Sequence, residues 1–238
     1  MLGFHPERGG YVAQADPTER RLVRGLAADV VTMLGLSVTD ILGEREARKQ
    51  AAFDDDAPAL DPLAQYESEL ADLADLELRI AEESEVGSAD SDEELARIPM
   101  DDAIARLLPD MSEDPELARE LRSMTQDALA VAKAENLATF YASLEGENDV
   151  VWVANDDAAS WLAASNDIRL VLAARLEIVD ESSSEAVYKR ASYLTGEEAS
   201  QAGREVETQD DLLAVLYAML TWWQESLLHA VGIKARRR

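Results

Sequence analysis

Polar side chains interrupt two apolar stretches in the second half of the chain. The stretch at 161–178 reads WLAASNDIRLVLAARLEI and holds Asn166, Asp167, Arg169 and Arg175. The stretch at 212–233 reads LLAVLYAMLTWWQESLLHAVGI and holds Thr221, Gln224 and Glu225. If both are helices that pack together, Arg169 and Glu225 form a buried or half-buried pair, with Asn166 and Gln224 beside them. Burying charges is costly unless they are paired, so we expect this network to matter.

Two interpretations of the network follow from its residue types. In the first, it fixes the register of two packed helices, and structural networks of this kind are commoner than sites. In the second, the helices at 157–178 and 209–231 flank a polar cleft for a ligand or a reaction. Arg169 and Arg175 would then hold an anion, and Glu225 or Asp167 would act as a base. A buried pair predicts that Glu225→Ala costs about 2–4 kcal/mol.

Other catalytic patterns are weaker, and the sequence favours a non-enzymatic protein. Glu225 and His229 lie four residues apart, as in a chelating pair, but the chain has only two histidines. Carboxylate-bridged metal bundles need two Glu-x-x-His motifs and further acids, so we expect no metal and no cofactor. The chain has no cysteine, which excludes disulfides and thiolate sites. Gly-rich phosphate loops and nucleophile elbows are also absent from the sequence.

The chain is strongly acidic. It carries 49 acidic against 22 basic residues, a formal net charge of −27. This charge repels phosphate backbones and anionic bilayers, so we expect no nucleic-acid partner and no membrane partner. A transcriptional regulator is disfavoured for the same reason, because the only basic cluster is Lys234–Arg238, which we interpret as a solvated helix end.

Membrane and export signals are also weak. The longest apolar run of the 212–233 stretch, Leu212–Leu220, is shorter than the roughly 20 residues that a bilayer span needs. The opening MLGFHPERGG lacks the basic start and apolar run of a secretory signal. We therefore expect a soluble cytoplasmic protein.

The elements that would position the polar residues are mainly helices. Strand signals occur at 9–14 and 149–155, and each leads into a capped helix, through Asp16-Pro17-Thr18-Glu19 and Asn155-Asp156-Asp157. Helical patterns cover 17–36, 114–144, 157–178 and 209–231. The expected fold class is mainly α, a helical bundle with a small two-stranded β ribbon built from two strand-then-capped-helix units.

Apolar spacing predicts which side of the 114–144 helix faces the core. Its inward residues are expected to be Leu117, Leu121, Met124, Ala128, Leu137, Phe140 and Leu144. The adjacent Trp222 and Trp223 point to different sides of their helix, so one of them is a candidate interface residue.

The chain is expected to form a single helical domain, 1–238, with two polar interruptions. An acidic insert at 44–99 is expected to be partly disordered, because its stretch EESEVGSADSDEE at 82–94 has no apolar face to bury; between Asp54 and Asp114, 21 acids stand against three arginines. Inside it, Leu63, Tyr66, Leu70, Leu73 and Ile80 have helical spacing. A polar linker at 180–208 joins the last two helices. A homodimer through a tryptophan or the insert is compatible with this organisation.

Three segments resemble the signature stretches of a bacterial domain-of-unknown-function family, number 2017, known mainly from actinomycetes. They are ARLLPDMSEDPELARELRSMTQDAL, WLAASNDIRLVLAARLEI and LYAMLTWWQESLLHAV, and the opening GGYVAQADPTERRLV fits as well. The chain departs from the family at Met111, where an aromatic residue is usual, and at Thr221, where an Asp-Trp pair is more frequent.

The resemblance implies a set of polar positions and a biological setting. The positions are Arg106, Asp110, Arg122, Thr125, Asn166, Asp167, Arg169, Arg175, Gln224 and Glu225. Genes of the family often lie near the Clp protease adaptor and a small metallopeptidase, which implies a link to Clp-type proteolysis. Together with the absent catalytic pattern, this predicts an interaction or regulatory module with a protein partner.

Overall fold

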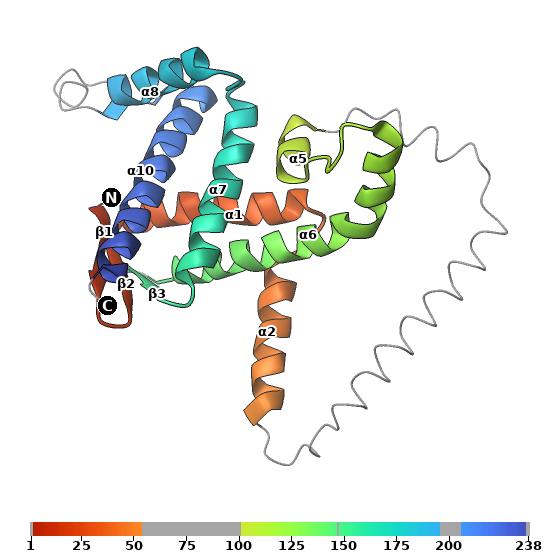
Figure 1. The fold of residues 1–238 in the computed structure, drawn as a ribbon. Coiled ribbons are helices and arrows are strands. Elements are labelled where there is room, and N and C mark those ends of the chain that lie inside the picture. The colour runs from red at the N-terminus through yellow and green to blue at the C-terminus, as the bar shows by residue number, and fades with distance from the viewer. Residues whose placement is uncertain (1, 54–100, 147, 196–205, 237–238) are drawn as a thin grey trace. The chain divides into compact units, whose positions relative to one another are not determined.

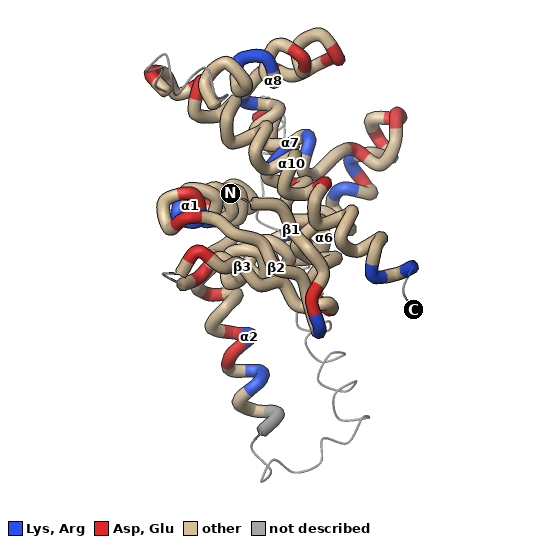
Figure 2. Tube along the Cα trace, turned by 90° about the vertical axis from the view of Figure 1, so that its left-hand side faces the viewer, with Lys and Arg blue, Asp and Glu red and all other residues tan. Residues whose placement is uncertain are grey.

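The computed structural model describes residues 2–53, 101–146, 148–195 and 206–236. The chain divides into two compact units, one made of 1–42 with 101–238 and the other of 43–100. The predicted insert, 44–99, has nearly the bounds of the second unit. Only the last part of helix α2 (Val38–Phe53) is described there, and it carries acidic and basic residues in turn (Figure 2). The other expectations for the insert lie outside the described residues.

A three-stranded antiparallel sheet lies in the first unit (Figure 1). Its order is β1 (Leu2–Glu7), β2 (Gly10–Gln14), β3 (Val150–Ala154). The predicted ribbon corresponds to β2 and β3, which pair Tyr11 with Val153 and Gln14 with Val150. The prediction of two strands was wrong, because β1 is a third strand. It contains Pro6, which a sheet tolerates on an edge strand, and its register is irregular between Leu2 and His5.

The helix starts show which predicted caps form. Helix α1 (Pro17–Met33) begins with a complete capping box, in which Asp16 accepts from the Thr18 and Glu19 amides and Glu19 accepts from the Asp16 amide. The predicted cap of α7 (Ala158–Arg175) forms differently. Asp157 is the N-cap residue without a side-chain cap bond, and Asn155 Oδ1 instead accepts a hydrogen bond from Lys234 Nζ at 2.6 Å.

The remaining helices include some that the sequence did not reveal. Helices α6 (Pro115–Ser143) and α10 (Gln209–Ala235) agree with predicted helical patterns, whereas α5 (Asp102–Leu107), like α2, was not predicted. Helix α8 (Glu181–Thr195) occupies the first half of the predicted 180–208 linker. It buries Val187 and Ala191, and the Tyr188 ring lies 5.7 Å from that of Tyr217 in α10. The second half of the linker is described only from residue 206.

An aromatic cluster forms the centre of the first unit. The Trp161 ring lies 4.5 Å from Phe140, 5.0 Å from Phe4 and 5.3 Å from Trp223, measured between ring centroids. Trp161 and Trp223 are fully buried. The Phe4 amide donates to Ser226 Oγ at 3.0 Å, and Trp223 Nε1 donates to the Leu2 carbonyl at 3.2 Å. These contacts hold the edge strand β1 against α10.

The first half of α6 faces a different way from the prediction. Leu117 is 46% exposed, Met124 is 73% exposed, and Ala128 is exposed as well. The core side of α6 is formed by Ala130, Ala134, Leu137, Ala138 and Phe140. The predicted inward orientation of Leu117, Met124 and Ala128 was therefore wrong, whereas that of Leu137, Phe140 and Leu144 is confirmed.

No single helix within the described residues is both long enough and apolar enough to cross a membrane.

Candidate functional site

Arg169 joins α7 to α10 through neutral partners. Its Nε donates to Thr221 Oγ1 at 2.9 Å, and its Nη1 donates to Gln224 Oε1 at 2.7 Å. The guanidinium carbon lies 5.4 Å from the centroid of the Tyr217 ring. Gln224 completes the group by donating from Nε2 to the Leu162 carbonyl at 3.2 Å. These bonds join polar side chains of α7 and α10 where the two helices pack together.

The predicted pair between Arg169 and Glu225 does not form in the described part of the chain. Glu225 is exposed, and the bonds of Arg169 go to Thr221 and Gln224 instead. Thr221 lies four residues after Tyr217, and Gln224 lies three residues after Thr221. Thr221 and Gln224 therefore share the side of α10 that faces α7. Glu225 follows Gln224 directly and is turned by about 100° around the helix, toward solvent. Asn166 is exposed too, and it does not lie beside Glu225 in a buried network.

Asp167 belongs to a separate network on the opposite side of α7. Its Oδ1 lies 2.6 Å from Lys133 Nζ of α6, and the two side chains are 4% and 20% exposed. Burial raises the pKa of the Asp167 carboxyl, and the hydrogen bond and charge of Lys133 counteract that rise. Two residues along a helix differ by about 160° in direction, so Asp167 and Arg169 cannot line one cleft between α7 and α10.

Arg175 lies at the end of α7 and binds another element. Its Nη2 donates to Asp101 Oδ2 at 2.8 Å, in a partly exposed ion pair. Asp101 also caps α5 by accepting from the Ala103 amide. This backbone bond first, and Arg175 second, lower the pKa of the Asp101 carboxyl. Arg175 therefore anchors the start of α5 rather than holding an anion together with Arg169.

Three of the four positions implied by the resemblance alone meet at a small concavity between the α5–α6 loop and α6. Asp110 and Arg122 form an ion pair, and Thr125 Oγ1 lies 3.6 Å from Met111 Sδ. The concavity has a volume of about 100 Å³ and is lined by Leu108, Pro109, Asp110, Met111, Arg122, Thr125, Gln126 and Leu129. The fourth position, Arg106, forms an ion pair with Asp102 within α5 at 3.9 Å.

The predicted polar positions thus separate into groups that fasten different pairs of elements. Arg169 connects α7 with α10, Asp167 connects α7 with α6, and Arg175 connects α7 with α5. The described residues also contain no group of three or more His, Asp or Glu side chains arranged to hold a metal ion. This arrangement suits a structural framework.

Two basic residues with many partners were missed by the sequence reasoning. Arg20 of α1 is 2% exposed and donates to the carbonyls of Leu144, Glu145, Asn148 and Val150. Burial, and then the neighbouring Arg24, lower the pKa of its guanidinium. Lys234 Nζ donates to the carbonyls of Glu7 and Gly10 at 2.7 and 3.0 Å. The prediction of a solvated end at Lys234 was wrong, because this side chain ties α10 to the β1–β2 turn.

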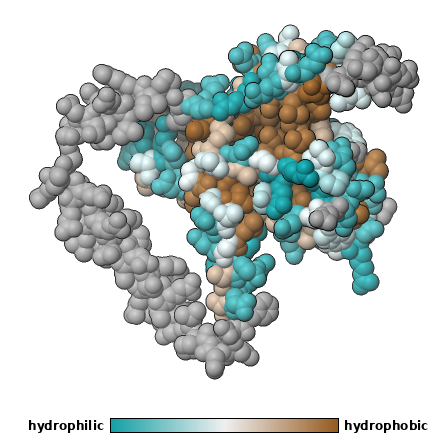
Figure 3. Space-filling model, turned by 180° about the vertical axis from the view of Figure 1, so that it is seen from behind, coloured by the Kyte–Doolittle hydropathy of each residue, from teal (hydrophilic) through white to brown (hydrophobic). Residues whose placement is uncertain are grey.

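An apolar groove lies along the outward side of α10. Its floor is formed by Val215, Ala218, Met219 and Trp222, and its walls by Ala191 and Thr195 of α8 and Glu19 of α1. Its volume is about 490 Å³. Trp222 is 45% exposed, in contrast to the buried Trp223. Figure 3 shows apolar residues gathered beneath the hydrophilic row of α8, which runs along the top of that view.

Comparison with known proteins identifies a family for this chain. The family described as Domain of unknown function (DUF2017) matches residues 1–231, so the chain belongs to it. No curated protein and no solved structure matches the chain.

Proposed function

Because the family to which the chain belongs carries no assigned activity, we propose a function from the geometry: the protein is a non-enzymatic interaction module that binds an apolar helix of a partner protein in the α10 groove. The observation that carries this proposal is the partly exposed Trp222 on the floor of an apolar groove. Exposed aromatic residues in apolar depressions are typical centres of protein interfaces.

The shape of the groove supports a helical occupant. Val215, Met219 and Trp222 are spaced by four and three residues, so they form a ridge along the open side of α10. Helix α8 and the first turn of α1 flank this ridge. A helix from a partner can pack its own apolar ridge between these walls, as in other helix-in-groove complexes.

The chemistry of the lining argues against a small polar ligand. Sites for small molecules converge several polar groups on one point. Here the only polar side-chain groups of the lining are the Glu19 carboxylate, the Thr195 hydroxyl and the indole N–H of Trp222. A second copy of the chain is also disfavoured as the occupant, because two molecules of formal charge −27 repel each other.

The alternative of an enzyme with a polar cleft between α7 and α10 has less support. Arg169 would have to receive an anion there, but its Nε and Nη1 already donate to Thr221 and Gln224. A link to Clp-type proteolysis stays a prediction from the family resemblance. It enters the proposal only as one source of partners to test.

Site-specific crosslinking followed by a binding assay tests the proposal. A photoreactive residue placed at Trp222 should crosslink one protein in native lysate, whereas the same residue at Leu228 should not. Leu228 is the matched control because it is 60% exposed on another side of α10. The crosslinked segment, made as a peptide, should bind the purified full chain and shift the tryptophan emission to the blue.

Two substitutions decide the outcome. Val215→Asp should weaken binding of that peptide at least tenfold, and Leu228→Asp should leave it unchanged, with melting temperatures confirming that both variants fold. Equal crosslinking at positions 222 and 228, or equal binding by the two variants, would show that the groove is not the interface.

A further inference from the structure

Helix α6 carries a second apolar surface, on the side opposite its core contacts. Leu117, Met124 and Val131 are 46%, 73% and 48% exposed and follow one another at seven-residue intervals. Leu121 and Ala128 stand between them, half-buried and exposed respectively. We call these five residues the α6 stripe. No other element among the described residues of the first unit covers it. Single exposed apolar residues are ordinary, whereas a row of them in register is not.

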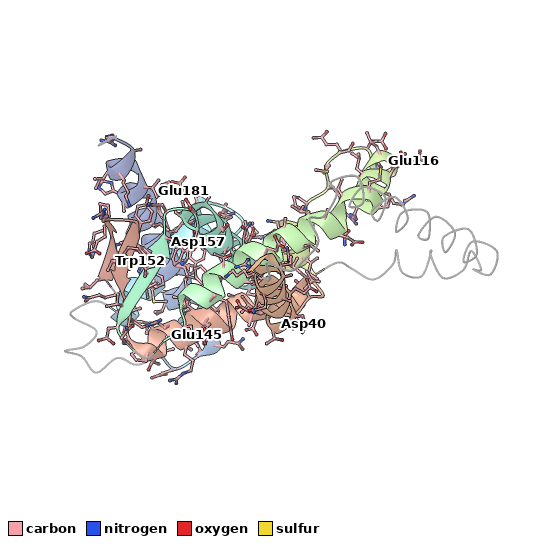
Figure 4. All side chains as sticks on the ribbon, turned by 90° about the horizontal axis from the view of Figure 1, so that it is seen from below. Asp40, Glu116, Glu145, Trp152, Asp157 and Glu181 are labelled. Carbon is pink, nitrogen blue, oxygen red and sulfur yellow. The ribbon has the colours of Figure 1, made fainter. Side chains whose placement is uncertain are left out.

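The spacing of the α6 stripe specifies a type of packing. Its residues alternate between steps of four and three, which is the seam of a left-handed pair of helices. From Leu117 to Val131 the seam is about 21 Å long at the usual helical rise. Figure 4 shows the start of α6, marked by Glu116, on the side of the unit away from Trp152 and the sheet.

Acidic residues border one side of the stripe. Glu120 and Asp127 flank the seam, and Glu116 lies farther around the helix on the same side. All three are exposed, and none of these carboxylates has an ion pair among the described residues. The other border carries Thr125 and Ala132, which have no charge. Charges at these border positions select the partner of a helical pair, so this arrangement favours lysine or arginine on the incoming helix.

The same borders argue against a second copy of the chain. In an antiparallel pair of two α6 helices, the acidic border of one copy faces the acidic border of the other. In a parallel pair, it faces Thr125 and Ala132. Neither arrangement gives the carboxylates a basic partner, and the first one adds repulsion.

We propose that the α6 stripe is a second docking surface, separate from the α10 groove, and that it binds a basic amphipathic helix of a partner protein in left-handed, coiled-coil-like packing. The apolar seam supplies the buried area, and Glu120 and Asp127 pair with basic side chains along one edge of the incoming helix, with Glu116 adding negative charge beside them. This surface depends on no residue of the groove.

Synthetic helices of defined chemistry test the proposal on the full chain. The probe is a 21-residue peptide with leucine at the two seam positions of each seven-residue repeat and lysine at the border positions. The control peptide has glutamate in place of every lysine. Fluorescence anisotropy should show binding of the lysine peptide and at least tenfold weaker binding of the glutamate peptide. Raising the salt concentration should weaken the lysine complex. Equal binding of both peptides, or no binding of either, overturns the proposal.

Matched variants locate the contact. Met124→Glu should abolish binding of the lysine peptide, and the triple variant Glu116→Gln, Glu120→Gln, Asp127→Asn should weaken it at least tenfold. Leu228→Glu and Val215→Asp should leave it unchanged, which separates this surface from the α10 groove. Because Met124, Glu116, Glu120 and Asp127 are exposed, these variants should fold normally, and circular dichroism checks that they do.

Cysteine labelling distinguishes the other occupants, since the chain has no cysteine of its own. Met124→Cys should react rapidly with a maleimide in the free protein and slowly with the lysine peptide present. Arg119→Cys, on another side of α6, should react at the same rate in both cases. Slow labelling at position 124 in the free full chain overturns the proposal. If deleting residues 54–98 then restores rapid labelling, the chain itself covers the stripe. If sedimentation shows a dimer, a second copy covers it.

Discussion

Lys133→Met tests the ion pair between α6 and α7. The Lys133 ammonium lies 2.6 Å from Asp167 Oδ1, and the Asp167 side chain is only 4% exposed. The substitution leaves a buried carboxylate without its cation, and losing one partner of a buried pair typically costs about 3–5 kcal/mol. Because the Lys133 side chain is 20% exposed, water can enter the space that the lysine leaves in the variant. We therefore expect the lower end, about 3 kcal/mol at pH 8.

The loss should depend on pH in a defined direction. Burial already raises the folded pKa of Asp167 above 3.8, and Lys133 is the group that counteracts the rise. Lys133→Met therefore raises this pKa further. An acid whose folded pKa exceeds its unfolded pKa destabilises the fold as pH rises between the two values. The variant's deficit in unfolding free energy, relative to wild type, should thus shrink as pH falls toward 4. The total decrease is about 1.4 kcal/mol for each tenfold change that the substitution causes in the acid dissociation constant of folded Asp167.

Urea unfolding followed by circular dichroism, at fixed ionic strength between pH 5 and pH 8, measures these changes. Lys133→Met, Asp167→Asn and the double variant form a thermodynamic cycle with the wild type. Lys189→Met is the matched control, because its lysine pairs with Glu185 on an exposed surface. A deficit below 1 kcal/mol, or one that is the same at pH 5 and pH 8, would refute the reasoning that Lys133 neutralises a buried carboxylate.

Three further predictions concern single side chains. Arg20→Met should destabilise the fold by at least about 3 kcal/mol in urea unfolding, because it removes the Arg20 donor from the carbonyls of Leu144, Glu145, Asn148 and Val150. Exposed Arg21→Met should change the stability by less than about 0.5 kcal/mol. Arg169→Met should lower the unfolding free energy by about 1–3 kcal/mol, and Glu225→Ala should lower it by less than about 0.5 kcal/mol. The reverse order would support the Arg169–Glu225 pair expected from the sequence. The pKa of Asp211 is lowered to about 2 by Thr208 and then Arg190. NMR titration should show its carboxyl ionised down to that pH, with stability from this group lost as pH falls through it, and Arg190→Met should raise the midpoint.

Local signals predicted the elements whose ends are fixed by neighbouring residues. The Asp16 box and the Asp114 cap set the starts of α1 and α6 through bonds to amides two or three residues away. Strand β1 was missed because Pro6 weakens its pattern, and it is held instead by Trp223 and Ser226 from α10. Helix α8 was missed because its few apolar residues contact α10 in three dimensions, which polar composition does not reveal.

The polar residues were found, but their partners were not. Pattern reasoning on α7 identified Asp167 and Arg169 as unusual in an apolar helix, and both do engage neighbouring helices. Which neighbour each one meets depends on the rotation of α7 about its axis, and about 160° separates the two. Lys133 lies 34 residues before Asp167, on a helix whose first half had been assigned to the wrong side. Orientation, a property of packing, was the missing information.

The hydrogen bond between the Phe4 amide and Ser226 Oγ spans 222 positions of the chain. A ribosome makes β1 before α10, so the strand exists without its covering helix while the residues between them are synthesised. Until then Phe4 lacks Trp223, one of its two tryptophan neighbours, and its apolar surface stays open to water. A nascent chain of this protein therefore carries an uncovered edge strand until α10 is made, and such a strand is open to edge-to-edge pairing with other chains.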